Sequence, residues 1–128
     1  MTPRFVVLCH RFPLRSCRAS HWDWMFEHGS VLHTWSARRW PAADGVESIR
    51  LSDHRIDYLE YEGRVSGDRG SVRRVLRGRY RLVVALPAYR LMSILGPDVT
   101  GRVALQRLSP EDREPDRWRL ACDLRPLR

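Results

Sequence analysis

The segment His21-Trp22-Asp23-Trp24 places two side chains that could bind a metal ion two residues apart. In a β-strand such residues share a face, so His21 and Asp23 would point one way and the tryptophans the other. An imidazole beside a carboxylate suits a divalent ion such as Mn²⁺ or Zn²⁺. His10, which ends the preceding apolar segment, could supply a third ligand. Three protein ligands leave positions for water and a phosphate oxygen, as in a catalytic metal site.

Two alternatives stand beside this metal site. A His-x-Asp pair at the start of a strand is usually a pair of solvated polar residues. Zinc could instead be held by Cys9, His10, Cys17 and His21, but adjacent Cys9 and His10 would face opposite sides of a strand, and the spacing matches no standard zinc pattern. With Cys122, the chain has three cysteines, an odd and sparse set that predicts buried or incidental thiols rather than disulfides.

His54 and Tyr58 are four residues apart and share a face in a helix and in a strand. Both could donate to phosphate oxygens, and His54 could protonate a leaving oxygen as a general acid. The alternative is a hydrogen-bonded surface histidine beside a core tyrosine. We treat His28 and His33 as surface or hairpin residues.

Arginines cluster in two places where they could neutralise the phosphates of a nucleic-acid backbone. The alternative is a solvated basic face. In a regular strand Arg73 and Arg77 would share a face. The clusters contain Arg38 and Arg39, and then Arg73, Arg74, Arg77 and Arg79.

The rest of the chain indicates short strands separated by turns, which favours a barrel or a sandwich. Asp53–Tyr61 is ambiguous between strand and helical turns, and Pro87–Leu95 could be a short helix. Loops are expected at Arg11–Ser20, Trp40–Gly45, Ser66–Ser71 and Ser109–Asp116. The expected strands are Arg4–His10, a hairpin of His21–Glu27 with Val31–Trp35, then Gly45–Leu51, Val72–Leu76, Arg79–Leu86, Arg102–Leu108 and Trp118–Leu124.

Length and composition predict a single domain over residues 1–128, with 43% hydrophobic residues and five tryptophans for a core. The net charge of +8 favours polyanionic partners, although all 23 basic residues are arginine, which also indicates a GC-rich coding bias. No apolar run reaches the roughly 20 residues that span a bilayer, and Met1–His10 lacks the features of a signal peptide. We therefore expect a cytoplasmic protein without a membrane partner.

The order of five segments resembles the 3′-phosphoesterase domain of bacterial DNA ligase D, and most closely its free-standing, single-domain members. The resemblance covers about Arg4 to Tyr80, with a weaker echo in Gly101–Leu108 and Trp118–Leu120. It rests on the order and spacing of the segments rather than on one motif. The segments are RFVVLCH, HWDWMFE, SVLHTWSARRW, LSDHRIDYLEYEG and VSGDRGSVRRVLRGRY.

This resemblance implies a small β-barrel with one or two short flanking helices. It implies a Mn²⁺-dependent enzyme that trims 3′ ends of DNA or RNA–DNA during end joining, removing a terminal ribonucleoside and then the 3′-phosphate, with a DNA ligase or polymerase as a partner. The family's metal ligands fall on His10, His21 and Asp23. Its phosphate-contacting groups fall on His54, Tyr58 and Arg39, and Glu62 also matches.

The sequence departs from the family pattern where arginines would bind phosphate. Met25 stands two residues after Asp23 in place of an arginine, and a second family arginine falls near Val46, with Arg50 close by. Lost arginines would weaken charge stabilisation in the transition state. We therefore retain as alternatives a non-catalytic module that binds nucleic-acid ends or a repair partner, and a basic barrel that binds RNA or another acidic ligand without end preference.

Overall fold

The computed structural model describes residues 2–13 and 19–126 of the chain. Cys17 and the middle of the predicted Arg11–Ser20 loop lie outside the described residues. No helix in the described part is long and apolar enough to cross a membrane. The elements are β1 (Arg4–Arg11), β2 (His21–His28), β3 (Val31–Ala37), β4 (Val46–Arg55), the 3₁₀ helix η1 (Ile56–Leu59), β5 (Gly63–Arg64), β6 (Ser71–Leu86), β7 (Tyr89–Pro97), β8 (Val99–Arg107) and β9 (Arg117–Pro126).

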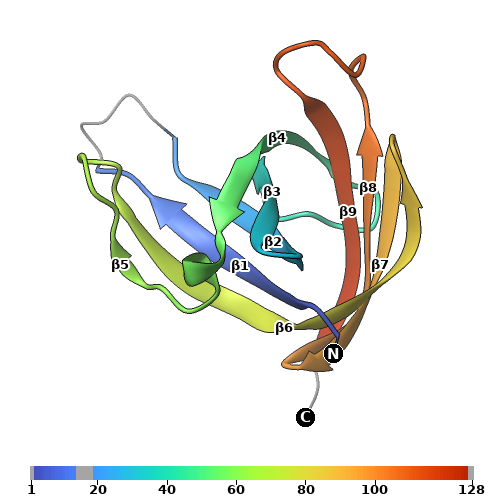
Figure 1. Cartoon of the computed structure of the whole chain (residues 1–128), viewed down its shortest axis with the longest axis horizontal. Coiled ribbons are helices and arrows are strands. Elements are labelled where there is room, and N and C mark those ends of the chain that lie inside the picture. Colours follow the sequence, from blue (N-terminus) through green and yellow to red (C-terminus); the bar gives the residue numbers. More distant parts are fainter. Residues whose placement is uncertain (1, 14–18, 127–128) are drawn as a thin grey trace.

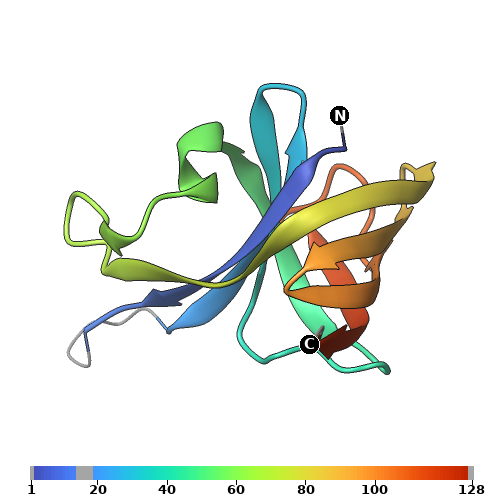
Figure 2. The same cartoon turned by 90° about the horizontal axis from the view of Figure 1, so that it is seen from below.

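The strands form one antiparallel sheet in the order β1-β2-β3-β4-β9-β8-β7-β6-β5, and β1 also pairs with β6, which closes a ring (Figures 1 and 2). The ring closes because β6 is 16 residues long. Its first half pairs with β1 and its second half with β7. The expected mainly β, barrel-like fold is confirmed.

Three tryptophans fill the inside of the ring. Trp24, Trp35 and Trp118 come from β2, β3 and β9 and are each 0% exposed. The rings of Trp35 and Trp118 meet edge to face, with centroids 5.5 Å apart. Alternation along each strand sends every second side chain into this core, which includes Phe5, Val7, Phe26, Tyr80, Met92, Ile94, Val103, Leu105 and Leu120.

A second apolar core covers the outer face of β1 and β2. Leu59, from the short helix η1, packs over it and is 6% exposed. The strand β1 is therefore buried on both faces, which explains why Phe5 to Leu8 is a continuous apolar run rather than an alternating one. The buried members of this core are Val6, Leu8, Met25, Leu32, Leu59 and Val72, with Ile56, Tyr58 and Val65 packed against them.

The structure corrects or refines three expectations about local structure. The short helix expected over Pro87–Leu95 is wrong, because strand β7 begins at Tyr89 and its alternate residues enter the inner core. The two strands expected on either side of Gly78 are one strand, β6; a Cβ at Gly78 would lie 2.1 Å from the carbonyl oxygen of Gly96, so only glycine allows this approach. The ambiguous Asp53–Tyr61 contains both structures, with strand to Arg55 and then η1.

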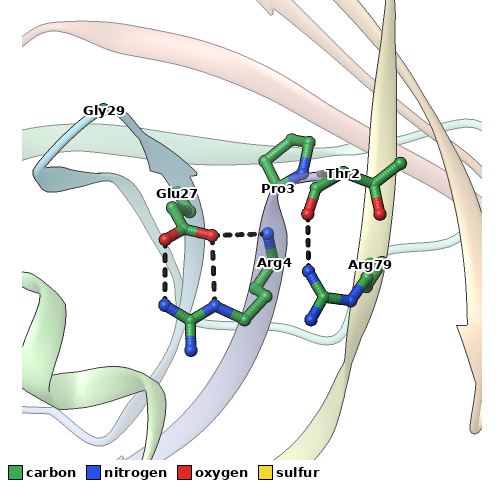
Figure 3. Close-up of a pocket in the computed structure, with 6 residues that line it drawn as sticks. All are labelled: Thr2, Pro3, Arg4, Glu27, Gly29 and Arg79. Atoms are coloured by element: carbon green, nitrogen blue, oxygen red, sulfur yellow. Dashed lines mark hydrogen bonds and ion pairs between the residues drawn. The ribbon is translucent and has the colours of Figure 1, made fainter.

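The start of β1 is fixed by charge (Figure 3). The guanidinium of Arg4 donates to both carboxylate oxygens of Glu27, over 3.1 and 2.9 Å, and its backbone N–H donates to the same carboxylate over 2.8 Å. Arg79, on the neighbouring strand, donates to the carbonyl oxygen of Thr2 over 2.6 Å. These contacts align β1 between β2 and β6 before the chain reaches the apolar run.

The second core yields a test of how much η1 stabilises the fold. Leu59→Ala should lower the free energy of unfolding by about 2–4 kcal/mol, because it removes a buried side chain and leaves a cavity between η1 and the sheet. Leu86→Ala, at a leucine that is 58% exposed, should change it by less than about 0.5 kcal/mol. Urea unfolding followed by tryptophan fluorescence measures both changes. Equal effects of the two substitutions would contradict a contribution of η1 to the stability of the fold.

Candidate metal centre

Three side chains meet on the outer face of the β1–β2 pair, beside the second core. His10 lies opposite His21 in the ladder, and Leu8 lies opposite Asp23. Directly opposed residues put their side chains on the same face, so His10, His21 and Asp23 form one cluster. The structure thus brings together the three residues that the sequence suggested as metal ligands.

The distances in this cluster suit a small cation. His10 Nδ1 lies 3.4 Å from Asp23 Oδ2, and His21 Nε2 lies 3.1 Å from Asp23 Oδ1. All three ligand atoms lie within 4.8 Å of one another. Asp23 is 3% exposed, and among the described residues its buried Oδ1 gains a hydrogen bond only when His21 Nε2, 3.1 Å away, carries a proton. A buried carboxylate oxygen in that state needs a positive partner.

The outer ring nitrogens of both histidines face backbone carbonyls. His10 Nε2 donates to Arg69 O over 2.6 Å, and His21 Nδ1 donates to Ala19 O over 3.2 Å. A carbonyl only accepts, so these nitrogens carry their hydrogens. In the neutral rings the inner nitrogens then carry no hydrogen, and their lone pairs face the carboxylate of Asp23. Carbonyl-oriented imidazoles of this kind are typical of metal-binding histidines.

Three sets of lone pairs facing one another repel unless a proton or a metal cation lies among them. Burial alone would lower the pKa of His21, but the hydrogen bond and charge of Asp23 and the carbonyl of Ala19 outweigh burial and the opposing charge of Arg38, so the pKa is raised. Burial would raise the pKa of Asp23, but His10 and His21 outweigh it and lower that pKa. A divalent ion would replace the proton with more charge at the same place.

An aromatic ring and an open groove border the cluster. Phe12 stacks on His10 with centroids 4.5 Å apart and lies 5.7 Å from the His21 ring. The groove runs between Arg11 to Pro13 and the turn before β6, and Arg64 also lines it. A Cβ at Gly70, whose φ is +77°, would lie 2.0 Å from Arg11 O. Glycine at this position therefore allows the turn to place the carbonyl of Arg69 against His10.

His54 and Tyr58 lie together, but away from the metal ligands. Their rings are 5.7 Å apart, and His54 Nδ1 donates to Ser52 O over 2.9 Å. His54 lies opposite Leu32 on β3, whereas Asp23 lies opposite Ser36. Four residues of strand separate those positions, which is about 13 Å. The roles of His54 and Tyr58 in binding phosphate or in catalysis stay predictions.

Arg38 and Arg39 occupy an exposed bend directly after β3. Arg38 is close enough to His21 for its charge to oppose protonation of that ring. It is therefore a cation at the edge of the cluster, where the resemblance had suggested Arg39. The phosphate-binding role of Arg39 stays a prediction.

A bulge in β6 decides which of its arginines share a face. Arg74 lies opposite Leu8 and Arg77 opposite Val6, so both point to the outer face, whereas Arg73 lies opposite Cys9, on the inner-face side. The regular strand that would align Arg73 with Arg77 is thus absent from this described segment. The Arg74 guanidinium donates to Leu59 O over 3.2 Å, and its backbone N–H donates to Glu62 Oε2 over 3.0 Å. Contacts of these arginines with nucleic acid stay predictions.

Met25 shares the outer face with Asp23 but is 1% exposed within the second core. Met25 is thus a packing residue at the position where the resembled family has an arginine, and it brings no charge to this point of β2. Cys9 lies opposite Trp22 and on the other face from His10, as the alternation indicated. The zinc alternative that joins Cys9 to His10 is therefore wrong as far as the described residues go.

Sequence reasoning missed the parts of the site that have no side-chain signature. The carbonyls of Arg69 and Ala19, which orient the two rings, come from turns rather than from motifs. Phe12 also escaped notice, although an aromatic residue two positions after His10 on an extended chain is a signal that could have identified it.

Comparison with known proteins does not identify a family for this chain. No protein-family model matches the chain, and the search of curated proteins finds no match.

Metal binding should depend on the Asp23 carboxylate. Asp23→Asn keeps the size but removes the charge, and should weaken Mn²⁺ or Zn²⁺ binding by about 100-fold or more, because even the partners of metal ligands are worth 10–100-fold. Isothermal titration calorimetry measures this. The matched control is Asp44→Asn, at an exposed aspartate, which should bind as the wild type does. Equal loss of metal affinity in both variants would exclude the cluster as the metal site.

The stability of the metal-free protein should depend on pH through the same cluster. The raised pKa of His21 gives stability that is complete below its unfolded pKa of about 6.5 and is lost as pH rises through the folded value. The lowered pKa of Asp23 gives stability that is present above about pH 4 and is lost as pH falls through the folded value. Thermal unfolding with and without Zn²⁺ should therefore show a larger metal stabilisation at pH 8 than at pH 5.5, and Asp23→Asn should abolish that difference.

Proposed function

We propose that this protein is a metal-dependent phosphoesterase that processes the 3′ ends of nucleic acid in DNA repair by end joining. It would remove a 3′-phosphate or a terminal ribonucleotide. The proposal rests on one observation: the inner nitrogens of His10 and His21 and the buried carboxylate of Asp23 face one another. The outer nitrogens of both rings are already engaged by carbonyls.

The donor set fits the ion that the family resemblance implies. Two neutral imidazoles and one carboxylate suit Mn²⁺ and also Zn²⁺, and three protein ligands leave positions for water and a phosphate oxygen. When bound, such an ion would polarise the phosphate and lower the pKa of a bound water. The assignment of Mn²⁺ over Zn²⁺ belongs to the proposal.

The protein's own residues would position the substrate. The groove beside the cluster carries Arg11 and Arg64, and Arg38 borders His21. Guanidiniums at these places can bind phosphates of the strand that leads to the reacting end. Phe12, stacked on His10, could support a terminal base or sugar. A DNA ligase or polymerase that uses the cleaned 3′ end would be the natural partner.

A second function, the binding of nucleic-acid ends without turnover, is favoured by Met25. At the position where the family pattern has a phosphate-binding arginine, this chain has a methionine buried in the second core. A site without that cation stabilises a charged transition state less well. The protein would then recognise ends and recruit a repair partner.

The two functions differ in their response to metal. With Mn²⁺ and a DNA primer that ends in a 3′-phosphate, the enzyme should release inorganic phosphate, and Asp23→Asn or His21→Ala should reduce the rate by about 100-fold or more. Asp44→Asn should retain the rate. Phosphate release that persists in Asp23→Asn would identify a contaminating phosphatase.

The binding module would show a different pattern in the same preparation. Affinity for the primer would fall steeply with salt, as expected for arginine–phosphate contacts, and a chelator would leave it unchanged. No phosphate would be released at any Mn²⁺ concentration. Equal affinity for 3′-hydroxyl and 3′-phosphate primers, together with no release of phosphate, would contradict both functions and favour a barrel without end preference.

A further inference from the structure

A second group of charged side chains lies inside one end of the ring, on the opposite sheet face from the metal ligands. Arg50 on β4 and Arg90 on β7 both stack on Trp35, with their guanidinium carbons 5.0 and 5.4 Å from the ring centroid. Trp35 is 0% exposed and belongs to the inner core. The two cations are therefore neighbours at the edge of an apolar interior.

The charge of this pair is incompletely balanced within the described residues. Arg50 has one carboxylate nearby, Asp53, at 3.8 Å, and that side chain is 46% exposed. Arg90 has no ion pair with a described carboxylate; its guanidinium donates to His33 Nδ1 over 2.8 Å. Burial lowers the pKa of Arg90, and the charge of Arg50 lowers it further. Two adjacent cations share one screened anion.

Two other arginines, Arg107 and Arg4, are each paired with a carboxylate, and Arg90 differs from them in this respect. Arg107 also stacks on a core tryptophan, but it donates to both oxygens of Asp116 over 3.2 and 3.3 Å. In the pocket of Figure 3, the guanidinium of Arg4 is paired with both oxygens of Glu27. Arg90 sits in a comparable semi-buried setting with a neutral imidazole in place of a carboxylate.

The contact with Arg90 fixes the tautomer of His33. Because Nδ1 accepts from Arg90, the neutral ring carries its hydrogen on Nε2. Burial, with the charges of Arg50 and Arg90, lowers the pKa of His33 to about 4, so the ring is neutral near pH 7. Nε2 lies 4.0 Å from Asp53 Oδ1, which is too long for a hydrogen bond. The Nε2–H therefore points away from Arg90, to the side of the ring on which Asp53 lies.

We propose that Arg50 and Arg90 form a binding site for a phosphate group at this end of the ring, with His33 positioning Arg90. A tetrahedral oxyanion can accept from two guanidiniums at once, and a dianion matches the charge of the two arginines. The site lies on the inner face and does not depend on the metal centre or on the function proposed for it. The phosphate could be free or could end a nucleic-acid strand.

The first experiment uses the wild-type protein in EDTA, so that no divalent ion contributes. Titration calorimetry with inorganic phosphate, in chloride of matched ionic strength, should show saturable binding. In a ¹⁵N spectrum the indole N–H of Trp35 should shift during the titration, while that of Trp24 stays in place. Absence of saturable binding beyond that of chloride would overturn the site, without reliance on any variant.

Variants then locate the binding. Arg90→Gln and Arg50→Gln should each weaken phosphate binding by at least about tenfold, the usual value of one charge-assisted hydrogen bond. Arg81→Gln is the matched control, because Arg81 is exposed on the outer side of β6 between the inner residues Tyr80 and Leu82, and it should bind within about twofold of wild type. Unchanged binding in a folded Arg90→Gln would overturn the proposal.

Two further arms separate this site from the metal centre and identify the source of the phosphate. Asp23→Asn should leave phosphate binding unchanged; loss in that variant would place the phosphate at the outer cluster and overturn the inner site. A short DNA oligonucleotide with a terminal phosphate that competes with inorganic phosphate supports a strand end as ligand. Competition by inorganic phosphate and mononucleotides alone supports free phosphate, and the site stands in both cases.

Discussion

The burial of β1 on both faces is the constraint on which the candidate site depends. Closure of the ring against β6 covers one face of β1, and η1 with its neighbours covers the other. Polar groups can then occupy the outer face only beyond the second core, where β1 ends and β2 begins. His10, His21 and Asp23 lie at that boundary. The carboxylate of Asp23 is therefore desolvated, while the side chains of His10 and His21 remain 15% and 18% exposed.

That desolvation makes the cluster more than a polar surface. An exposed His–Asp pair contributes at most about 1 kcal/mol, and nothing in such a pair demands a ligand. An ionised carboxylate that is 3% exposed carries a penalty of several kcal/mol unless it is paired. The imidazoles held by the carbonyls of Arg69 and Ala19 can offset that penalty when a proton on His21 or a metal ion lies between them and the carboxylate. The inference of a metal site thus rests on burial, which the spacing of residues alone cannot provide.

This difference shows what the sequence can reveal about such a site. Alternation in His21–Trp24 predicted which side chains share a face, and strand geometry made that prediction reliable. The helix expected over Pro87–Leu95 failed because a short apolar run with a proline does not distinguish a hairpin arm from a helix. The bulge that separates Arg73 from Arg77 and the carbonyls that orient the histidines were unpredictable, since both arise from tertiary pairing. Long-range contacts of this kind leave no local pattern.

Met25 belongs to the second core and lies on the same strand face as the candidate metal ligand Asp23. A side chain at this position faces outward, opposite Val6 and Thr34 on the neighbouring strands, and an arginine there would have to bury its stem in the second core. A methionine fills that space without a charge to solvate. The chain therefore gains packing where a phosphoesterase of the resembled family has a phosphate ligand. Under the proposed function, transition-state charge would be balanced by cations that approach from the rim, and Arg38, whose charge already reaches His21, is one such cation.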